Sequence, residues 1–139
     1  MIAFDADVLS LMLAGHAGFL YRAGLFPAGE QTVPIIVVEE VLRGRLNGIR
    51  RAEAKNSKTS LERAYELLEI TFNALQQLTI LSYSTAADDL YKQWRSQGLR
   101  VGTHDLRIAA ICVASSTTLI TRNRRDFEKI PELSLEVWT

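Results

Sequence analysis

The chain has 139 residues, of which 47% are hydrophobic and 23% charged, and its formal net charge at pH 7 is zero. These values are typical of a globular protein and exclude a disordered or fibrous chain. A zero net charge provides no overall attraction to nucleic acid or to membranes, so a polyanionic partner must be bound by a local group of residues. By length, we expect residues 1–139 to form a single domain.

The sequence further predicts a cytoplasmic protein without a membrane partner. No run of residues approaches the roughly 20 apolar positions that a membrane helix needs. The N-terminus, Met1 to Asp5, lacks the basic segment of a secretory signal. The single cysteine, Cys112, lies in an apolar run, so we expect a buried side chain rather than a reactive thiol.

In the first part of the chain, the apolar pattern predicts two strands and two helices. A short buried strand over 1–4 precedes a helix within 8–25. The β-branched run 33–38 does not alternate with polar residues, which is typical of a strand covered on both faces. A helix is expected over 39–51, and basic and polar residues from Arg43 to Lys58 interrupt the apolar pattern.

Helices and strands alternate in the rest of the chain as well. Thr59 and Glu62 form a capping box that predicts the start of a helix continuing to Leu75. The expected elements that follow are a strand, two helices and two further strands, over 79–83, 85–97, 103–114, 117–121 and 133–137. Strands separated by helices predict an α/β sandwich around a mostly parallel sheet of four or five strands.

Carboxylates follow the ends of three predicted strands, where open parallel sheets bind their ligands. Asp5 and Asp7 follow the first strand, Glu39 and Glu40 the second, and Asp126 the fourth. Carboxylates that converge in this way repel one another and raise each other's pKa unless a cation lies among them. The periodicity of the helix does not choose between Glu39 and Glu40.

Asp105 is a further candidate for this cluster. At helical spacing it shares a stripe with Ile108, Ala109 and Cys112, so we expect it to point toward the buried face. The alternative is that Asp105 only compensates the positive end of its helix dipole.

Oxygen ligands without a set of cysteines and histidines favour Mg²⁺ or Mn²⁺ over zinc. Neither His16 nor His104 has a second histidine at ligand spacing, and His104 is interpreted as a surface residue at a helix start. No nucleophilic triad or phosphate-cradling glycine loop is present. The remaining chemistry is metal-assisted phosphoryl transfer, in which a bound cation activates water.

Basic residues provide two candidate surfaces for a phosphodiester backbone. The first follows the fourth predicted strand, and the second is a helical face for which solvation is the alternative. We expect substrate binding by Thr121, Arg122, Asn123 and Arg124, with Arg125 beside them; the helical face contains Arg43, Arg45, Arg50, Arg51 and Lys55.

Four blocks in this order resemble the PIN-domain family, most closely the VapC-type ribonuclease toxins of toxin–antitoxin modules. They are residues 4–9, 40–44, 102–110 and 119–127. The resemblance implies a three-layer α/β/α sandwich and an Mg²⁺-dependent endoribonuclease, for which Mn²⁺ can substitute. It also implies the toxin of a type II, VapBC-like system, an RNA substrate, a homodimer, and inhibition by a small cognate antitoxin.

The same resemblance assigns the site residues. Asp5, Glu40 and Asp105 would bind the metal, which selects Glu40 over Glu39, and Asp126 or Asn123 would fill the fourth position. Asp5, Glu40, Asp105 and Asp126 would be catalytic. The family often has an acid where this chain has Asn123, so the identity of the fourth ligand stays open.

Two other functions are weighed against the nuclease. Asn123 favours a catalytically degenerate PIN domain that binds RNA or a protein without cleavage. Asp5 and Asp7 after a strand also resemble the nucleophile motif of haloacid-dehalogenase-like phosphatases. In that family a Lys precedes a late acidic pair, whereas here Asp88 and Asp89 come before Lys92.

Overall fold

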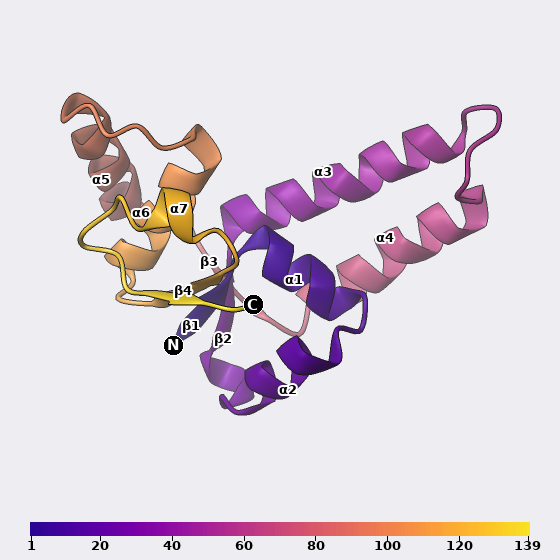
Figure 1. Ribbon diagram of the computed structural model, residues 1–139, viewed down its shortest axis with the longest axis horizontal. Helices are drawn as coiled ribbons and strands as arrows, with labels where there is room; N and C mark the ends of the chain where they lie inside the picture. The colour runs from indigo at the N-terminus through magenta and orange to yellow at the C-terminus, as the bar shows by residue number, and fades with distance from the viewer.

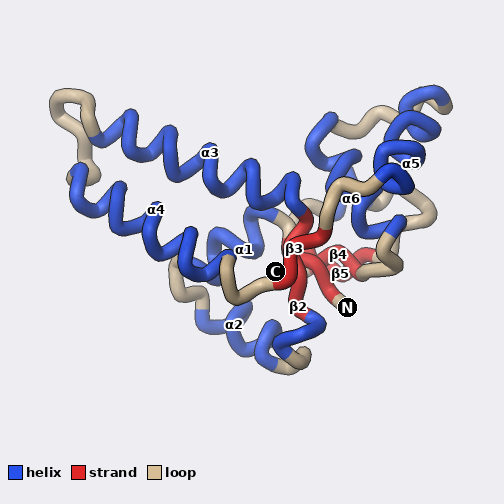
Figure 2. The backbone as a smooth tube through the Cα atoms, turned by 180° about the vertical axis from the view of Figure 1, so that it is seen from behind, coloured by secondary structure: helices blue, strands red, loops and turns tan.

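The computed structural model describes residues 1–139 and has a parallel sheet between two layers of helices (Figures 1 and 2). Every pair of neighbouring strands is parallel, in the order β3-β2-β1-β4-β5. The strands are β1 (Ile2–Phe4), β2 (Gln31–Pro34), β3 (Thr79–Leu81), β4 (Thr118–Thr121) and β5 (Leu135–Val137). The predicted α/β/α sandwich is confirmed.

The helices lie on both sides of the sheet, as Figure 2 shows. This is the arrangement that right-handed crossovers between parallel strands produce when the chain reverses its direction across the sheet. On one side are α1 (Ala6–Leu13), α2 (Ala17–Gly24), α3 (Ile35–Ala52) and α4 (Leu61–Leu75); on the other are α5 (Thr85–Ser96), α6 (Thr103–Ala114) and α7 (Arg124–Phe127). A 3-10 turn, η1 (Ala28–Glu30), precedes β2. None of the helices combines the length and the apolar character needed to cross a bilayer.

The central strands form the core of the protein. The side chains of β1 and the middle of β4 are almost completely buried, because helices cover both faces of the sheet. β1 lies between β2 and β4, so the strand order reverses there. Such a switch point leaves a crevice at the carboxyl ends of the two strands. Asp5 and Thr121 lie at this edge.

The prediction of a strand over 33–38 is wrong beyond Pro34, since α3 begins at Ile35. Val37, Val38 and Val41 are buried at helical spacing, while Ile35 is exposed. The apolar run therefore reflects one buried face of a helix, which a short β-branched run does not distinguish from a strand. As a result, Glu39 and Glu40 belong to a helix and do not directly follow a strand.

Two other boundaries differ from the predictions. The single helix expected within 8–25 is divided into α1 and α2 around Gly15, whose φ of +90° ends the first helix. His16 then caps α2, because its Nδ1 accepts a hydrogen bond from the backbone of Phe19 at 3.2 Å. At α4 the capping side chain is Ser60 rather than Thr59, and its Oγ accepts from the backbone of Arg63.

Candidate active site

Asp5 occupies the carboxyl end of β1 and is held in one orientation. Its backbone N–H donates to Ile120 of β4 at 2.9 Å, and its side chain is buried, with only 6% of the residue exposed. The carboxylate accepts hydrogen bonds from the backbone N–H of Ala6 at 2.8 Å and from the hydroxyl of Thr121 at 2.7 Å. Burial raises the pKa of Asp5 although both hydrogen bonds oppose it.

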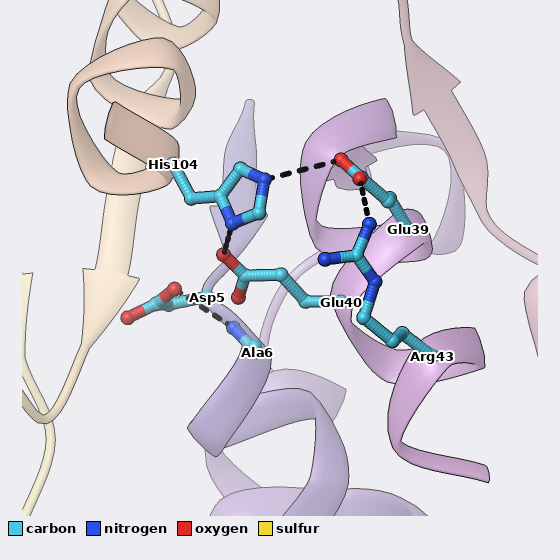
Figure 3. Close-up of polar contacts among 6 residues, drawn as sticks. All are labelled: Asp5, Ala6, Glu39, Glu40, Arg43 and His104. Atoms are coloured by element: carbon cyan, nitrogen blue, oxygen red, sulfur yellow. Dashed lines mark hydrogen bonds and ion pairs between the residues drawn. The ribbon is translucent and has the colours of Figure 1, made fainter. Parts of the chain in front are cut away.

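Glu40 reaches the same edge from α3. Burial raises its pKa to about 7, and the negative charges of Asp5, Asp105, Glu39 and Asp7 add to this effect. Figure 3 shows the Glu40 carboxylate beside that of Asp5, and the charge of Asp105 on α6 acts on Glu40 as well. Glu40 therefore belongs to a cluster of mutually repelling acids.

Asp105, in the first turn of α6, completes this cluster. The pKa of Asp105 is raised to about 6, mainly by burial. The charges of Asp5 and Asp126 raise it further, whereas His104 lowers it. The charge of Asp126 links the end of β4 to the cluster as well. The charges of Asp5 and Asp105 therefore act on Glu40, and those of Asp5 and Asp126 act on Asp105.

The donor set of this cluster fits a hard divalent cation that retains part of its water shell. No group of three or more carboxylate, histidine or cysteine side chains is placed to hold one ion directly. Mg²⁺, however, usually keeps several waters and takes only one or two carboxylates from the protein. No lysine or arginine pairs with Asp5, Glu40 or Asp105, and His104 is the basic side chain next to them.

His104 joins the cluster to α3 through two glutamates (Figure 3). Its Nε2 lies 3.4 Å from Glu39 and its Nδ1 lies 3.5 Å from Glu40, while Glu39 also pairs with Arg43 at 2.8 Å. Glu39 therefore belongs to the outer part of the network, and Glu40 lies next to Asp5. The interpretation of His104 as a surface residue missed this contact. The one signal for it in the sequence is that His104 precedes Asp105 directly.

Asn123 and Asp126 form a closed pair at the start of α7. The amide nitrogen of Asn123 donates to Oδ2 of Asp126 at 3.0 Å, and its amide oxygen accepts from the backbone of Asp126 at 3.4 Å. Asn123 thus caps α7. Both polar atoms of its side chain are engaged with Asp126, which leaves the Asp126 carboxylate as the charged group on this side of the cluster.

The structure corrects the expected role of Thr121 in substrate binding. Thr121 is completely buried, its hydroxyl donates to Asp5, and the same oxygen accepts from the backbone of Asn123 at 3.0 Å. Thr121 therefore holds the Asp5 carboxylate in place and is not exposed to a substrate. Arg122 and Arg124 are exposed and pair with no carboxylate, and Arg122 borders a hollow of about 450 Å³ together with Asp7 and Asn123.

Residues 2–133 match the family model described as "PIN domain". The chain belongs to the PIN-domain family. "Ribonuclease VapC1" of Haemophilus influenzae (strain R2866) is 30% identical over 117 residues, covering 83% of this chain and 79% of that protein. "Ribonuclease VapC2" of Rickettsia felis is 37% identical over 68 residues, which are 46% of this chain and about half, 51%, of the relative.

A solved structure supports the assignment over the full length. The chain resembles one from "VapBC2 from Rickettsia felis bound to a DNA fragment from their promoter", with a TM-score of 0.75, 26% identity and complete coverage of both chains. The five-stranded parallel sheet and its flanking helices are therefore those of a VapC-type PIN domain.

Proposed function

We propose that this PIN domain is an Mg²⁺-dependent endoribonuclease that hydrolyses RNA phosphodiester bonds, with Mn²⁺ as a substitute metal. The observation that carries the proposal is the placement of Asp5, Glu40 and Asp105 at one edge of the sheet, where burial raises all three pKa values and the charge of Asp5 raises those of Glu40 and Asp105 further. The VapC ribonucleases among its relatives support the same reaction.

The residues of the chain have distinct roles in this proposal. Asp5, Glu40, Asp105 and Asp126 would hold Mg²⁺, partly through water. When bound, the ion supplies a polarised water and compensates the charge that develops on the phosphate. Ala6 and Thr121 fix the carboxylate of Asp5 before substrate arrives. Glu40 would orient the attacking water and accept its proton once the cation has lowered the pKa of its carboxyl, which is about 7 without metal.

The exposed arginines after β4 would hold the substrate. Arg122 and Arg124 lie next to the Asn123–Asp126 pair and have no carboxylate partner, so they are free to bind phosphate oxygens. Asn123 itself would position Asp126 and would not coordinate the metal, because its amide is engaged. This arrangement places cationic groups beside the acidic cluster, as cleavage of a polyanion requires.

We further propose that the protein acts in the cytoplasm as the toxin of a type II, VapBC-like system, as a homodimer inhibited by a small cognate antitoxin. Support comes from the relatives named VapC and from the similarity to a chain of a VapBC2 complex. Expression of the protein alone, and together with any short reading frame that neighbours its gene, tests this part. Growth arrest that the neighbour relieves is expected, and growth unaffected by the toxin alone would contradict it.

Cleavage of RNA by the purified protein tests the enzymatic proposal. Wild type is expected to cleave with Mg²⁺ or Mn²⁺ and to be inactive in EDTA. Asp5→Asn and Asp105→Asn should each lose activity by a factor of about 100 or more. Asp89→Asn is a matched control, because Asp89 is exposed on α5 outside the cluster. Full activity in both site variants would reject the assignment.

The second candidate function is RNA or protein binding without cleavage. The amide of Asn123 favours it, because this position adds no negative charge to the cluster. Calorimetry with Mg²⁺ on the metal-free protein separates the two functions. Absence of binding between pH 6 and 8 would support the degenerate domain, whereas binding that disappears in Asp105→Asn supports the nuclease.

A further inference from the structure

A second candidate site lies on the hairpin of α3 and α4, which projects away from the sheet (Figure 1). A hollow of about 290 Å³ opens near its distal end. Its polar lining consists of Arg45, Arg51, Ser57 and Thr59, and no carboxylate borders it. Two guanidinium groups and two hydroxyls around one hollow are suited to an oxyanion such as phosphate.

The charge around this hollow is strongly positive although the whole chain is neutral. Residues 43–58 contain six basic residues and a single acid, Glu53, against a net charge of zero for the protein. Only Arg43 of these six pairs with a carboxylate, that of Glu39. The other five have no ion-pair partner and are therefore free to bind an anion: Arg45, Arg50, Arg51, Lys55 and Lys58.

Arg45 is already oriented for such a contact. Its Nε donates to the buried hydroxyl of Thr71 on α4 at 2.8 Å, which anchors the guanidinium between the two helices. Its two terminal nitrogens have no hydrogen-bond partner in the protein. An arginine fixed in this way loses little conformational entropy when it binds a ligand.

Two glycines form the floor of the hollow. Gly44 and Gly48 lie in the interior of α3, where each costs about 1 kcal/mol relative to alanine. Close helix packing does not explain them, because a Cβ atom at either position would meet nothing within 4 Å. What the glycines do is leave the surface of α3 open beside Arg45 and Arg51.

The hollow is aligned with the acidic cluster through α3 itself. Arg51 follows Glu40 by eleven residues, which at about 100° and 1.5 Å per residue places it roughly 16 Å along the helix and within about 20° of the same side. Gly44 lies between them on this stripe. A polynucleotide bound at Glu40 can therefore follow α3 toward the hollow.

We propose that this hollow is a phosphate-binding site that takes the RNA backbone at a distance from the bond that is cleaved. The inference rests on the proposed ribonuclease function for the identity of its ligand. It assigns the basic hairpin to substrate binding, and it makes Arg51, Arg45 and Thr59 the contacting groups.

Binding of a fluorescently labelled single-stranded RNA to the full-length protein in EDTA tests the site without cleavage. Arg51→Ala should raise the Kd about fivefold to tenfold near 0.1 M salt and reduce the slope of log Kd against log salt by about 0.7, the value for one phosphate contact. Arg50→Ala is the matched control. It removes the same charge from the same helical turn, but Arg50 does not line the hollow.

A second variant blocks the hollow without changing its charge. Gly48→Leu has room for its Cβ and favours the helix, so the melting temperature should stay the same or rise while the Kd increases several-fold. Gly29→Leu, at another position with open space, is its control and should bind RNA as wild type does. Equal effects of Arg50→Ala and Arg51→Ala, or unaltered binding by Gly48→Leu, would overturn the site.

The outcomes also separate this inference from the nuclease itself. If the protein cleaves RNA with Mg²⁺ but Arg51→Ala has no specific effect on binding, the hairpin site is rejected and the nuclease proposal stands. RNA binding that depends on Arg51, without any cleavage, would support the hairpin site and reject the nuclease. Failure of wild type to bind RNA in EDTA overturns the hairpin site. An oligoglutamate peptide of equal charge that binds more tightly than RNA, and depends on Arg51, would assign the hollow to an acidic protein and reject RNA.

Discussion

Thr121, the last residue of β4, donates its hydroxyl to the carboxylate of Asp5, 116 positions away and directly after β1. The contact joins the two strands at the point where the strand order reverses. It fixes the most deeply buried acid of the cluster, so the orientation of Asp5 depends on correct pairing of the two central strands.

Replacement of Thr121 by valine is expected to lower both stability and activity. Valine fills the same volume but leaves a buried carboxylate without one of its donors, which costs about 1 to 3 kcal/mol. Cleavage should fall about tenfold, since Asp5 loses its fixed orientation, and Thr121→Ser should restore most of it. Thermal denaturation and RNA cleavage measure the two effects. Thr118→Val at the other end of β4 should leave activity unchanged.

The pKa of Glu40 predicts a specific pH dependence of stability in the metal-free protein. The folded state keeps its proton up to about pH 7, whereas the ordinary pKa of a glutamate side chain, as in the unfolded chain, is 4.5. Stability is therefore highest below pH 4.5 with respect to this group and falls as the pH rises through 7. Because 26% of the side chain is exposed to screening water, the expected penalty is about 1 to 2 kcal/mol.

Glu40→Gln tests this penalty directly. In EDTA at pH 8 the variant should melt about 3 to 8 °C higher than wild type, and the difference should vanish near pH 4.5. Mg²⁺ should raise the melting temperature of wild type more than that of the variant. Glu132→Gln, an exposed control, should behave as wild type throughout. Equal pH profiles for Glu40→Gln and wild type would show that Glu40 is not in a repulsive cluster.

His104 is expected to act by positioning Glu40 from α6. Removal of the ring in His104→Ala should reduce kcat about threefold to tenfold with little change in KM, since the contact lies on the side of the metal ligands and not of the exposed arginines. His104→Gln, which keeps polar groups near both glutamates, should recover part of the loss. A change in KM alone would instead place His104 in substrate binding.

The sequence leaves open whether Asn123 or Asp126 is the fourth metal ligand, and Asn123→Asp tests the positioning role that the structure suggests for Asn123. If Asn123 positions Asp126, the aspartate keeps the cap of α7 but places a second charge about 3 Å from Asp126, which lowers stability in EDTA. Mg²⁺ should then stabilise the variant more strongly than wild type. Melting curves with and without the metal measure both effects. Unchanged stability in EDTA would show that the hydrogen bond to Asp126 contributes little.

The sequence predicts the places of Asp5 and Asp105 in the fold because each is tied to a local pattern. Asp5 follows a buried strand, and Asp105 lies on the apolar stripe of its helix, so their positions depend on short segments. The burial expected for Cys112 is confirmed, and burial raises the pKa of its thiol to about 12. Such features depend mainly on which face of an element is covered.

Features that depend on long-range packing were not predictable in the same way. The run after Pro34 has the residue types of a strand, and only the burial of Val37 and Val41 on one side explains the helix. The contact between Thr121 and Asp5 depends on β4 pairing with β1, which no local pattern encodes. The same holds for His104, because its partners Glu39 and Glu40 lie on a different helix.

The order of the strands has a consequence for how the protein matures. One edge of β1 has no partner until residues 118–121 pair with it. Before β4 has paired, Asp5 lacks both the neighbouring strand and the hydroxyl that orients it. Folding intermediates in which β4 is still unpaired are therefore expected to lack an oriented Asp5 carboxylate.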